Sequence, residues 1–292
     1  MKSPVLGYIK NKEIIGVRAI SSNEYADLNR SFDEINRYFR SSELLSYALF
    51  NHDDFFKSLN DWSVVFRDIQ DVGRHNLDRA VFDLNSKILN FLASVRTFLD
   101  HNETNVKRYY GEEEKECFKT ICADHYDGGF AYRFLYKLRN YSQHCGMPIG
   151  NLSINSYKEG NDLSDTRVDI ILTFDRDELL SRFDGWKSLK EELSSMPKNF
   201  DVTPLVQEMV FRLGDIHLSL VEILFKDIKE EAESVLRLHS EITENNSKVI
   251  ILDSTGLEEV NPTLSYKEIP VQQANWILQD LQTLSEDKTQ KS

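Results

Sequence analysis

The sequence predicts a mainly α protein, a helical bundle that carries small β-hairpin insertions. Residues 77–98 and 205–223 show a nearly seven-residue apolar repeat, which is typical of helices that pack in a bundle. With 12 Gly and 6 Pro in 292 residues, both types fall below their average usage of about 7% and 5%, which disfavours a turn-rich all-β fold. A hydrophobic share of 40% indicates a folded rather than a disordered chain.

The N-terminal part is expected to form a hairpin followed by a helix. Over residues 1–20, two apolar runs flank Asn11-Lys12, as in a β-hairpin. Ser21 with Glu24 three residues later is a capping-box pattern. Apolar residues at spacings of three and four then predict a helix that ends near Arg40.

The next elements are expected to be helical as well. Residues 42–70 are rich in aromatic side chains and are expected to form shorter helices or turns. The repeat over residues 77–98 predicts a long helix that opens at Asn76. Two more helices are expected, one near residues 112–124 and one over residues 130–144, which Gly146 and Pro148 close.

The C-terminal half mixes hairpins with helices. A hairpin is expected near residues 151–175, with its turn at Gly160-Asn161-Asp162. Thr203-Pro204 is a capping residue followed by proline at the first helical position, so one long helix is expected from there to about His239. A second strand pair over residues 249–252 and 263–269 and a final helix over residues 272–284 complete the chain.

These elements suggest three parts along the chain. Residues 1–20 form an N-terminal β-hairpin. Residues 21–245 form the helical bundle, which includes the hairpin insertion near 151–175. Residues 246–292 form a C-terminal β/α extension.

Charge and composition limit the classes of function. The chain has 35 Lys and Arg against 48 Asp and Glu, a net charge of −13, whereas proteins that coat nucleic acid are normally basic. Any contact with nucleic acid therefore needs a local positive site. No apolar run reaches the roughly 20 residues of a membrane span, so no membrane association is expected.

Cysteine content and the absence of common motifs add two further expectations. Three cysteines, Cys117, Cys122 and Cys145, are too few for a disulfide framework. Together with the lack of a signal-peptide core, they suggest a cytoplasmic protein with reduced thiols. The sequence lacks the phosphate-loop, dinucleotide, zinc-protease and esterase motifs, so we expect no cofactor and no metal.

One stretch differs from the rest of the chain. Residues 128–158 contain no acidic residue but include Arg133, Lys137, Arg139 and Lys158, which gives the stretch a charge of about +4. A buried core helix with few charges is the alternative explanation. Burial depletes acids and bases alike, however, and here only the acids are missing. We therefore expect a basic patch that contacts RNA.

The same stretch contains Arg139, Asn140 and His144. An arginine, often followed by a polar residue, with four to six residues before a histidine, is the motif of the HEPN family, which this segment resembles. The resemblance covers this helix in motif and residues 76–240 in general shape. It implies an all-α RNA-binding ribonuclease, a hydrolase that works without metal as a toxin or antiviral-defence effector. It also implies a homodimer and a possible regulatory protein partner.

These residue types suit RNA cleavage. His144, with an unperturbed pKa near 6.5, would act as general base or acid at the ribose 2′-hydroxyl. Arg139 would hold the phosphate with its planar fork of donors, and Asn140 would orient the imidazole or the substrate. The expected substrate-binding residues are Arg133, Tyr136, Lys137 and Tyr141.

Spacing alone does not single out this pair. Arg96–His101 and Arg212–His217 have the same separation, but each has a neighbouring acid, and we interpret both as structural. Arg139 and His144 themselves lie five residues apart, about 140° around a helix. A shared phosphate therefore requires Arg139 to wrap round, the helix to end early, or a second copy to contribute. We expect a homodimer.

The sequence thus predicts a metal-independent endoribonuclease of the HEPN type. The alternative is a non-catalytic helical scaffold that binds RNA or protein.

Overall fold

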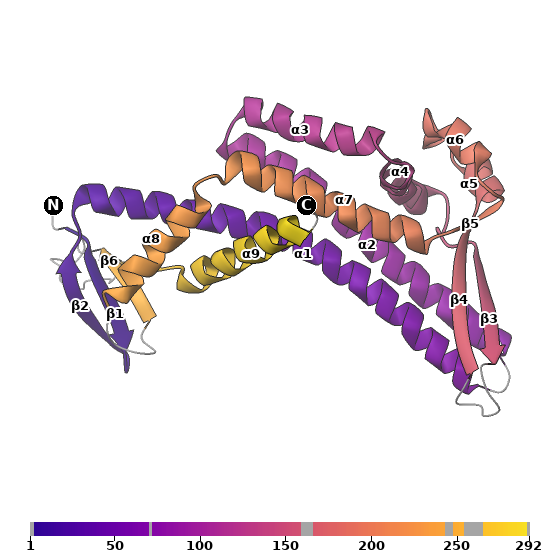
Figure 1. The fold of residues 1–292 in the computed structure, drawn as a ribbon, viewed down its shortest axis with the longest axis horizontal. Helices are drawn as coiled ribbons and strands as arrows, with labels where there is room; N and C mark the ends of the chain where they lie inside the picture. The colour runs from indigo at the N-terminus through magenta and orange to yellow at the C-terminus, as the bar shows by residue number, and fades with distance from the viewer. Residues whose placement is uncertain (1–2, 70–71, 159–165, 243–247, 254–264, 291–292) are drawn as a thin grey trace. The chain divides into compact units, whose positions relative to one another are not determined.

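The computed structural model describes residues 3–69, 72–158, 166–242, 248–253 and 265–290. It confirms a mainly α fold with small antiparallel sheets (Figure 1). The chain divides into two compact units. The terminal unit comprises Met1–Arg40 and Val221–Ser292, and the central unit comprises Ser41–Leu220. This division differs from the expected one, because the N-terminal hairpin and the C-terminal extension belong to the same unit.

A four-stranded sheet joins the two ends of the terminal unit. Its strands are β1 (Val5–Lys10), β2 (Glu13–Ala19), β6 (Lys248–Asp253) and β7 (Ser265–Glu268), in the order β2-β1-β6-β7. Both expected strand pairs are confirmed. Their union through β1 and β6, in which Tyr8 lies opposite Val249, was not predicted. The β1–β2 turn places Asn11 and Lys12 at φ of 51° and 70°, as a two-residue hairpin turn requires.

Helices cover this sheet and pack on one another. α8 (Ile228–Ser240) and α9 (Val271–Gln290) lie with the first part of α1 in the terminal unit. Tyr38 of α1 is fully buried and donates a hydrogen bond of 2.6 Å to Asp280. The Tyr38 ring contacts Phe225 and Trp276 edge-on, at centroid distances of 5.3 and 6.3 Å. This aromatic group fixes α9 against α1.

The N-terminal helix is much longer than expected. α1 runs from Ser22 to Asp68 over 47 residues, so the prediction of a break near Arg40 was wrong. The capping box is confirmed, because the Glu24 N–H donates to the Ser21 hydroxyl at 3.2 Å. Residues 42–68 contain neither Gly nor Pro, and buried Ala48 and Phe55 continue the helical spacing. Aromatic density was misread as irregular structure.

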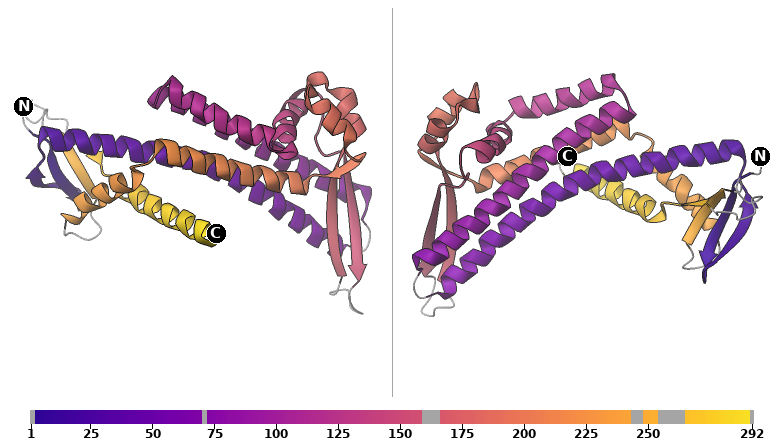
Figure 2. Two further views of the ribbon diagram at one scale, coloured as in Figure 1. Left: turned by 45° about the horizontal axis from the view of Figure 1, so that its top comes forward. Right: turned by 180° about the vertical axis from the view of Figure 1, so that it is seen from behind.

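In the central unit, α2 (Arg74–Tyr109) runs beside the second part of α1 (Figure 2). Ser41 donates to Asn102 at 3.0 Å, and Ser58 donates to Asp83 near the other end. The pairing of early with late residues shows that the two helices are antiparallel. The predicted seam of α2 is confirmed from Leu84 onward, since its members are fully or almost fully buried: Leu84, Ile88, Phe91, Val95 and Phe98.

The expected helix from Thr203 to about His239 is divided. α7 (Thr203–Leu224) ends before a turn, and α8 begins at Ile228. The turn is closed by a hydrogen bond of 3.1 Å from the Ile228 N–H to the Phe225 carbonyl. It places both of these apolar residues in the core, at 4% and 2% exposure. Continuous apolar spacing across the turn concealed it in the sequence.

A second sheet belongs to the central unit. β3 (Asn151–Lys158), β4 (Thr166–Asp175) and β5 (Asn199–Asp201) are antiparallel in the order β3-β4-β5. The first two confirm the expected hairpin, and its expected turn at Gly160-Asn161-Asp162 lies outside the described residues. The segment between β4 and β5 forms α5 (Arg176–Arg182), a short 3₁₀ turn (Asp184–Trp186) and α6 (Leu189–Ser195). None of these was predicted.

Within the described part of the chain, the structure contains no helix that is both long and apolar enough to cross a membrane.

Candidate functional site

Helix α4 carries the Arg139–His144 motif. It spans Phe130–His144, which confirms the expected bounds, and it ends where the Cys145 N–H donates to the Tyr141 carbonyl at 2.8 Å. One face of the helix is buried in the central unit, through Ala131, Tyr132, Phe134, Leu135, Leu138 and Tyr141. The opposite face at the C-terminal end is left for the polar residues of the motif.

Asn140 and His144 are exposed at that end, and Arg139 is half-buried. Arg139 Nη1 donates a hydrogen bond of 2.6 Å to Gln143 Oε1, so its guanidinium extends along the helix. Because α4 stays regular to His144, Arg139 and His144 point about 140° apart. An early end of the helix, one of the expected resolutions, is thereby excluded.

Arg133 holds the neighbouring helices together. Its Nη2 pairs with both carboxylate oxygens of Glu192 on α6, at 3.0 and 2.8 Å. Its Nη1 donates to the carbonyls of Tyr126 and Asp127, at 3.0 and 2.7 Å, which belong to the last turn of α3 (Glu112–Asp127). These contacts leave the side chain 19% exposed and give Arg133 a structural role, and its contact with RNA stays a prediction.

Lys137 also forms hydrogen bonds within the central unit. Its ammonium group donates to the carbonyls of Trp186 and Gly185 in the 3₁₀ turn. Burial lowers the pKa of Lys137, and nearby Lys187 lowers it further. The lysine therefore ties α4 to the segment after α5.

The two tyrosines pack within the unit. Tyr141 is 1% exposed, with its ring stacked on Trp186 at 6.1 Å. Tyr136 is half-buried and stacks on Tyr132 at 6.4 Å, and Arg96 lies over its ring at 4.6 Å. In this arrangement Tyr141 has no free face for an RNA base, contrary to the expectation that it stacks on one.

The basic patch is therefore smaller than the sequence indicated. Residues 128–158 contain no acidic residue, but acidic residues of other segments lie beside them in the fold, as Glu192 does at Arg133. Lys107, near the C-terminal end of α2, pairs with Glu112 at 2.9 Å. Asn140 and His144 are the exposed residues of the predicted site, and Arg139 is half-buried, as Tyr136 is.

The arginines of the two other arginine–histidine pairs have structural contacts. His217 is 5% exposed, and its Nε2 lies 3.2 Å from the Ser42 hydroxyl. Arg212 reaches the carbonyls of His125 and Gly128, at 3.3 and 3.1 Å. Arg212 and His217 therefore do not present a guanidinium and an imidazole together to solvent. In the other pair, Arg96 Nε lies 2.7 Å from Asp100 Oδ2, and His101 is exposed.

A buried amide fixes the chain just after the site. Asn85 of α2 is 4% exposed, and its Oδ1 accepts a hydrogen bond of 3.0 Å from the Ile149 N–H. Asn85→Ala is expected to lower the free energy of unfolding by about 1–3 kcal/mol, because it leaves that buried N–H without an acceptor. Urea unfolding measures the change. Asn90→Ala, at an exposed position of the same helix, is the control, and an equal loss in both variants would contradict the assignment.

The contact of Cys122 on α3 with Tyr132 on α4 is expected to make the free energy of unfolding depend on pH in the alkaline range. Burial raises the pKa of the Cys122 thiol to about 12 and also raises the pKa of the Tyr132 phenol. In the unfolded chain the thiol loses its proton near pH 8.5. Stability is thus fully present below that pH and is expected to fall as pH rises toward about 12.

Urea unfolding at several pH values from about 8 to 11 tests this fall. Cys122→Ala is expected to flatten it, whereas Cys117→Ala, at an exposed position, should leave it unchanged. A fall of the same steepness in both variants would assign the effect to other groups.

One arginine near the motif was missed in the sequence. Arg182 of α5 lies against Gly146, with Nη1 3.2 Å from the point where a Cβ of that glycine would stand. Its position 38 residues after His144, in a segment whose helices were not predicted, gave no signal for this proximity.

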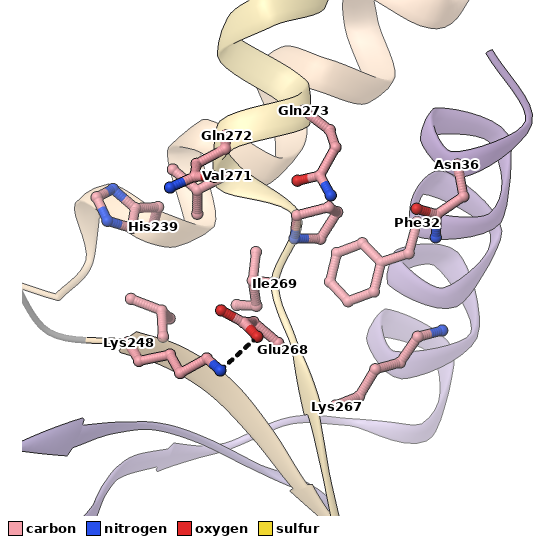
Figure 3. A pocket seen from close by; sticks show the side chains of 12 residues that line it. Phe32, Asn36, His239, Lys248, Lys267, Glu268, Ile269, Val271, Gln272 and Gln273 are labelled. Carbon is pink, nitrogen blue, oxygen red and sulfur yellow. Dashed lines mark ion pairs between the residues drawn. The ribbon is translucent and has the colours of Figure 1, made fainter. Parts of the chain in front are cut away.

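A pocket of about 670 Å³ lies in the terminal unit, among α1, β6, β7 and the start of α9 (Figure 3). Its two lysines already have partners. Lys248 pairs with Glu268 at 2.7 Å, and Lys267 donates to Asn29 at 2.8 Å. The two lysines come from opposite sides of strand β7 in the close-up (Figure 3), so they do not converge on one ligand. We assign no function to this pocket.

Among the described residues, no three His, Cys, Asp or Glu side chains are grouped so as to hold a metal ion. Comparison of the sequence with family models, with curated proteins and with solved structures finds no match.

Proposed function

We propose that the protein is a metal-independent endoribonuclease whose cleavage site is built on the C-terminal end of α4. The observation that carries this proposal is the exposure of His144 and Asn140 beside a half-buried Arg139, at the end of a helix whose other face is fully packed. His217 within α7, by contrast, is only 5% exposed.

The chemistry follows from these three groups. His144 takes the proton of a ribose 2′-hydroxyl, and the oxygen attacks the adjacent phosphorus. A bond forms between O2′ and phosphorus while the bond from phosphorus to O5′ breaks. The leaving O5′ takes a proton from water, and the protonated His144 returns its proton to solvent, so the products are a cyclic phosphate and a 5′-hydroxyl. Arg139 stabilises the added negative charge on the phosphate oxygens.

The separation of Arg139 from His144 around α4 supports a shared site. About 140° of rotation prevents both side chains of one helix from pointing straight at one phosphate. In the proposed homodimer, Arg139 of one copy and His144 of the other act on the same phosphate. Isologous pairing of two such helix ends produces two equivalent sites.

The proposal is tested by incubating the purified protein with cellular RNA in the presence of a chelator. We expect RNA fragments that end in a cyclic phosphate. Cleavage that occurs only when divalent metal is added would refute the metal-independent mechanism. Absence of cleavage in any condition would refute the enzymatic proposal.

A non-catalytic helical scaffold is the second candidate, and exposed aromatics favour it. Phe50, Phe82 and Phe211 are 69%, 79% and 73% exposed, which is unusual for phenylalanine and is common where protein partners bind. A scaffold would bind a partner without cutting RNA. A toxin or defence effector, the role we propose for the ribonuclease, would arrest growth when expressed, until a regulatory partner restrains it.

A further inference from the structure

The turn after α4 carries a guanidinium group from another part of the chain. Arg182 is the last residue of α5, and its Nη1 lies 3.2 Å from the position of a Cβ on Gly146. The Tyr141 hydroxyl lies 3.3 Å from the same position. Because Gly146 has no side chain, the guanidinium reaches the backbone two residues beyond His144.

The charge of Arg182 remains accessible. Its Nη2 lies 3.2 Å from Glu178 Oε1, one turn earlier in α5, and the two side chains are 54% and 38% exposed. An exposed pair of this kind contributes little to stability. A phosphate oxygen, which forms stronger and bidentate bonds with arginine, would therefore displace the Glu178 carboxylate readily.

The backbone that carries Arg182 is held firmly. The Asp175 carboxylate caps α5 by accepting two N–H bonds of 3.0 and 3.1 Å. At the other end, the Trp186 indole donates to the Leu179 carbonyl at 2.9 Å. Phe183 packs edge-on against Trp186, at a centroid distance of 5.2 Å. These contacts fix the start of the side chain before any ligand arrives.

A cation is needed at this place. The C-terminal end of a helix carries roughly half a negative charge, so the last turn of α4 repels a phosphate that approaches His144. Arg133 and Lys137 are used in internal contacts, and Arg139 points about 140° away from His144. Arg182 is positioned to offset the negative helix end.

From this geometry we propose that Arg182 binds a backbone phosphate of single-stranded RNA next to the one that is cleaved. This inference rests on the ribonuclease proposed above, and it names the substrate as RNA that is held by its backbone across the end of α4. Arg182 takes no proton from the substrate. It contributes to affinity and places the chain so that a 2′-hydroxyl meets His144.

The test measures binding separately from cleavage. The probe is a single-stranded oligonucleotide with 2′-O-methyl groups, which lacks the attacking hydroxyl, and fluorescence anisotropy gives Kd at several salt concentrations. Arg182→Ala is expected to raise Kd about tenfold and to reduce the slope of log K against log salt by about 0.7, the loss of one phosphate contact. Arg74→Ala removes an equally simple helical ion pair, at 93% exposure, and should change neither quantity.

A variant with the opposite sign separates binding from folding. Glu178→Gln removes the carboxylate that competes for Arg182, so we expect Kd to fall about threefold. A merely structural role for the ion pair would make Glu178→Gln and Arg182→Ala act in the same direction. Equal Kd and equal salt slope in the protein and in Arg182→Ala would overturn the inference.

The outcomes distinguish this inference from the function on which it rests. If Arg182→Ala weakens binding but the protein does not cleave RNA with free 2′-hydroxyls, the phosphate site stands and the ribonuclease fails. If the protein cleaves RNA and Arg182→Ala binds and cleaves normally, the ribonuclease stands and the phosphate site fails. No binding of the probe by the protein would refute the phosphate site, and cleavage of RNA with free 2′-hydroxyls would still decide the ribonuclease.

Discussion

Replacing His144 with alanine is expected to lower the rate of RNA cleavage by about 10²–10⁴-fold, because general acid–base catalysis contributes that much when the proton carrier is in place. His144 is exposed at the end of α4, so the substitution should leave folding intact. Cleavage of a labelled RNA in the presence of a chelator, with circular dichroism as the check on folding, measures the loss. Full activity in His144→Ala would remove the catalytic role.

The companion substitution tests how the site is assembled. Arg139→Ala should also abolish cleavage, and each variant alone should be inactive. If the site takes Arg139 from one copy and His144 from the other, an equal mixture of the two variants regains about a quarter of the normal activity, because half of the dimers are mixed and each has one intact site. Arg139→Lys keeps the charge but loses the planar fork, and we expect it to retain only part of the cleavage activity. A mixture that stays inactive would contradict the shared site.

The largest expected loss of stability is at Trp186. The indole is 1% exposed, stacks on Phe134 at 5.6 Å and donates to the Leu179 carbonyl. Trp186→Ala is expected to lower the free energy of unfolding by about 3–5 kcal/mol, the usual cost of removing a large buried aromatic side chain. Because the same ring packs on Tyr141, loosening of the turn that carries Arg182 should accompany the loss.

Urea unfolding, monitored by circular dichroism, measures this loss. Phe82→Ala, at a position that is 79% exposed, serves as the aromatic control and should change the free energy of unfolding by no more than about 0.5 kcal/mol. A loss of under about 1 kcal/mol in Trp186→Ala would mean that the aromatic cluster is not a cooperative part of the core.

Apolar spacing and turn residues predicted several helices and hairpins of the fold. α4 was placed correctly because an apolar face at spacings of three and four ends just before Gly146. The N-terminal hairpin followed from its two-residue turn at Asn11-Lys12. α1 is longer than the sequence predicts, because a high density of aromatic side chains after Arg40 is compatible with one continuous helix. In fact Phe55 and its neighbours continue the buried face of one helix.

Long-range contacts were beyond such signals. Nothing near Tyr8 indicates that its strand pairs with Val249, and nothing near Gly146 indicates the approach of Arg182. The substrate-binding expectations for Arg133 and Lys137 counted charge along the chain, whereas Glu192 and the carbonyls of the 3₁₀ turn reach these residues from other segments. Basic residues in a stretch without acidic residues can therefore still contact acidic residues or carbonyls of other segments in the fold.

The pairing of β1 with β6 has a consequence for biosynthesis. Tyr8 and Val249 are partners in the sheet, although 249 − 8 = 241 positions separate them. During translation at roughly 5–20 residues per second, β1 leaves the ribosome well before its neighbour β6 exists. The whole of Ser41–Leu220 is made in the interval and can fold first. Until β6 is made, the edge of β1 in the nascent N-terminal hairpin lacks its strand partner. A ribosome-associated chaperone that covers this edge would protect the chain most during this period.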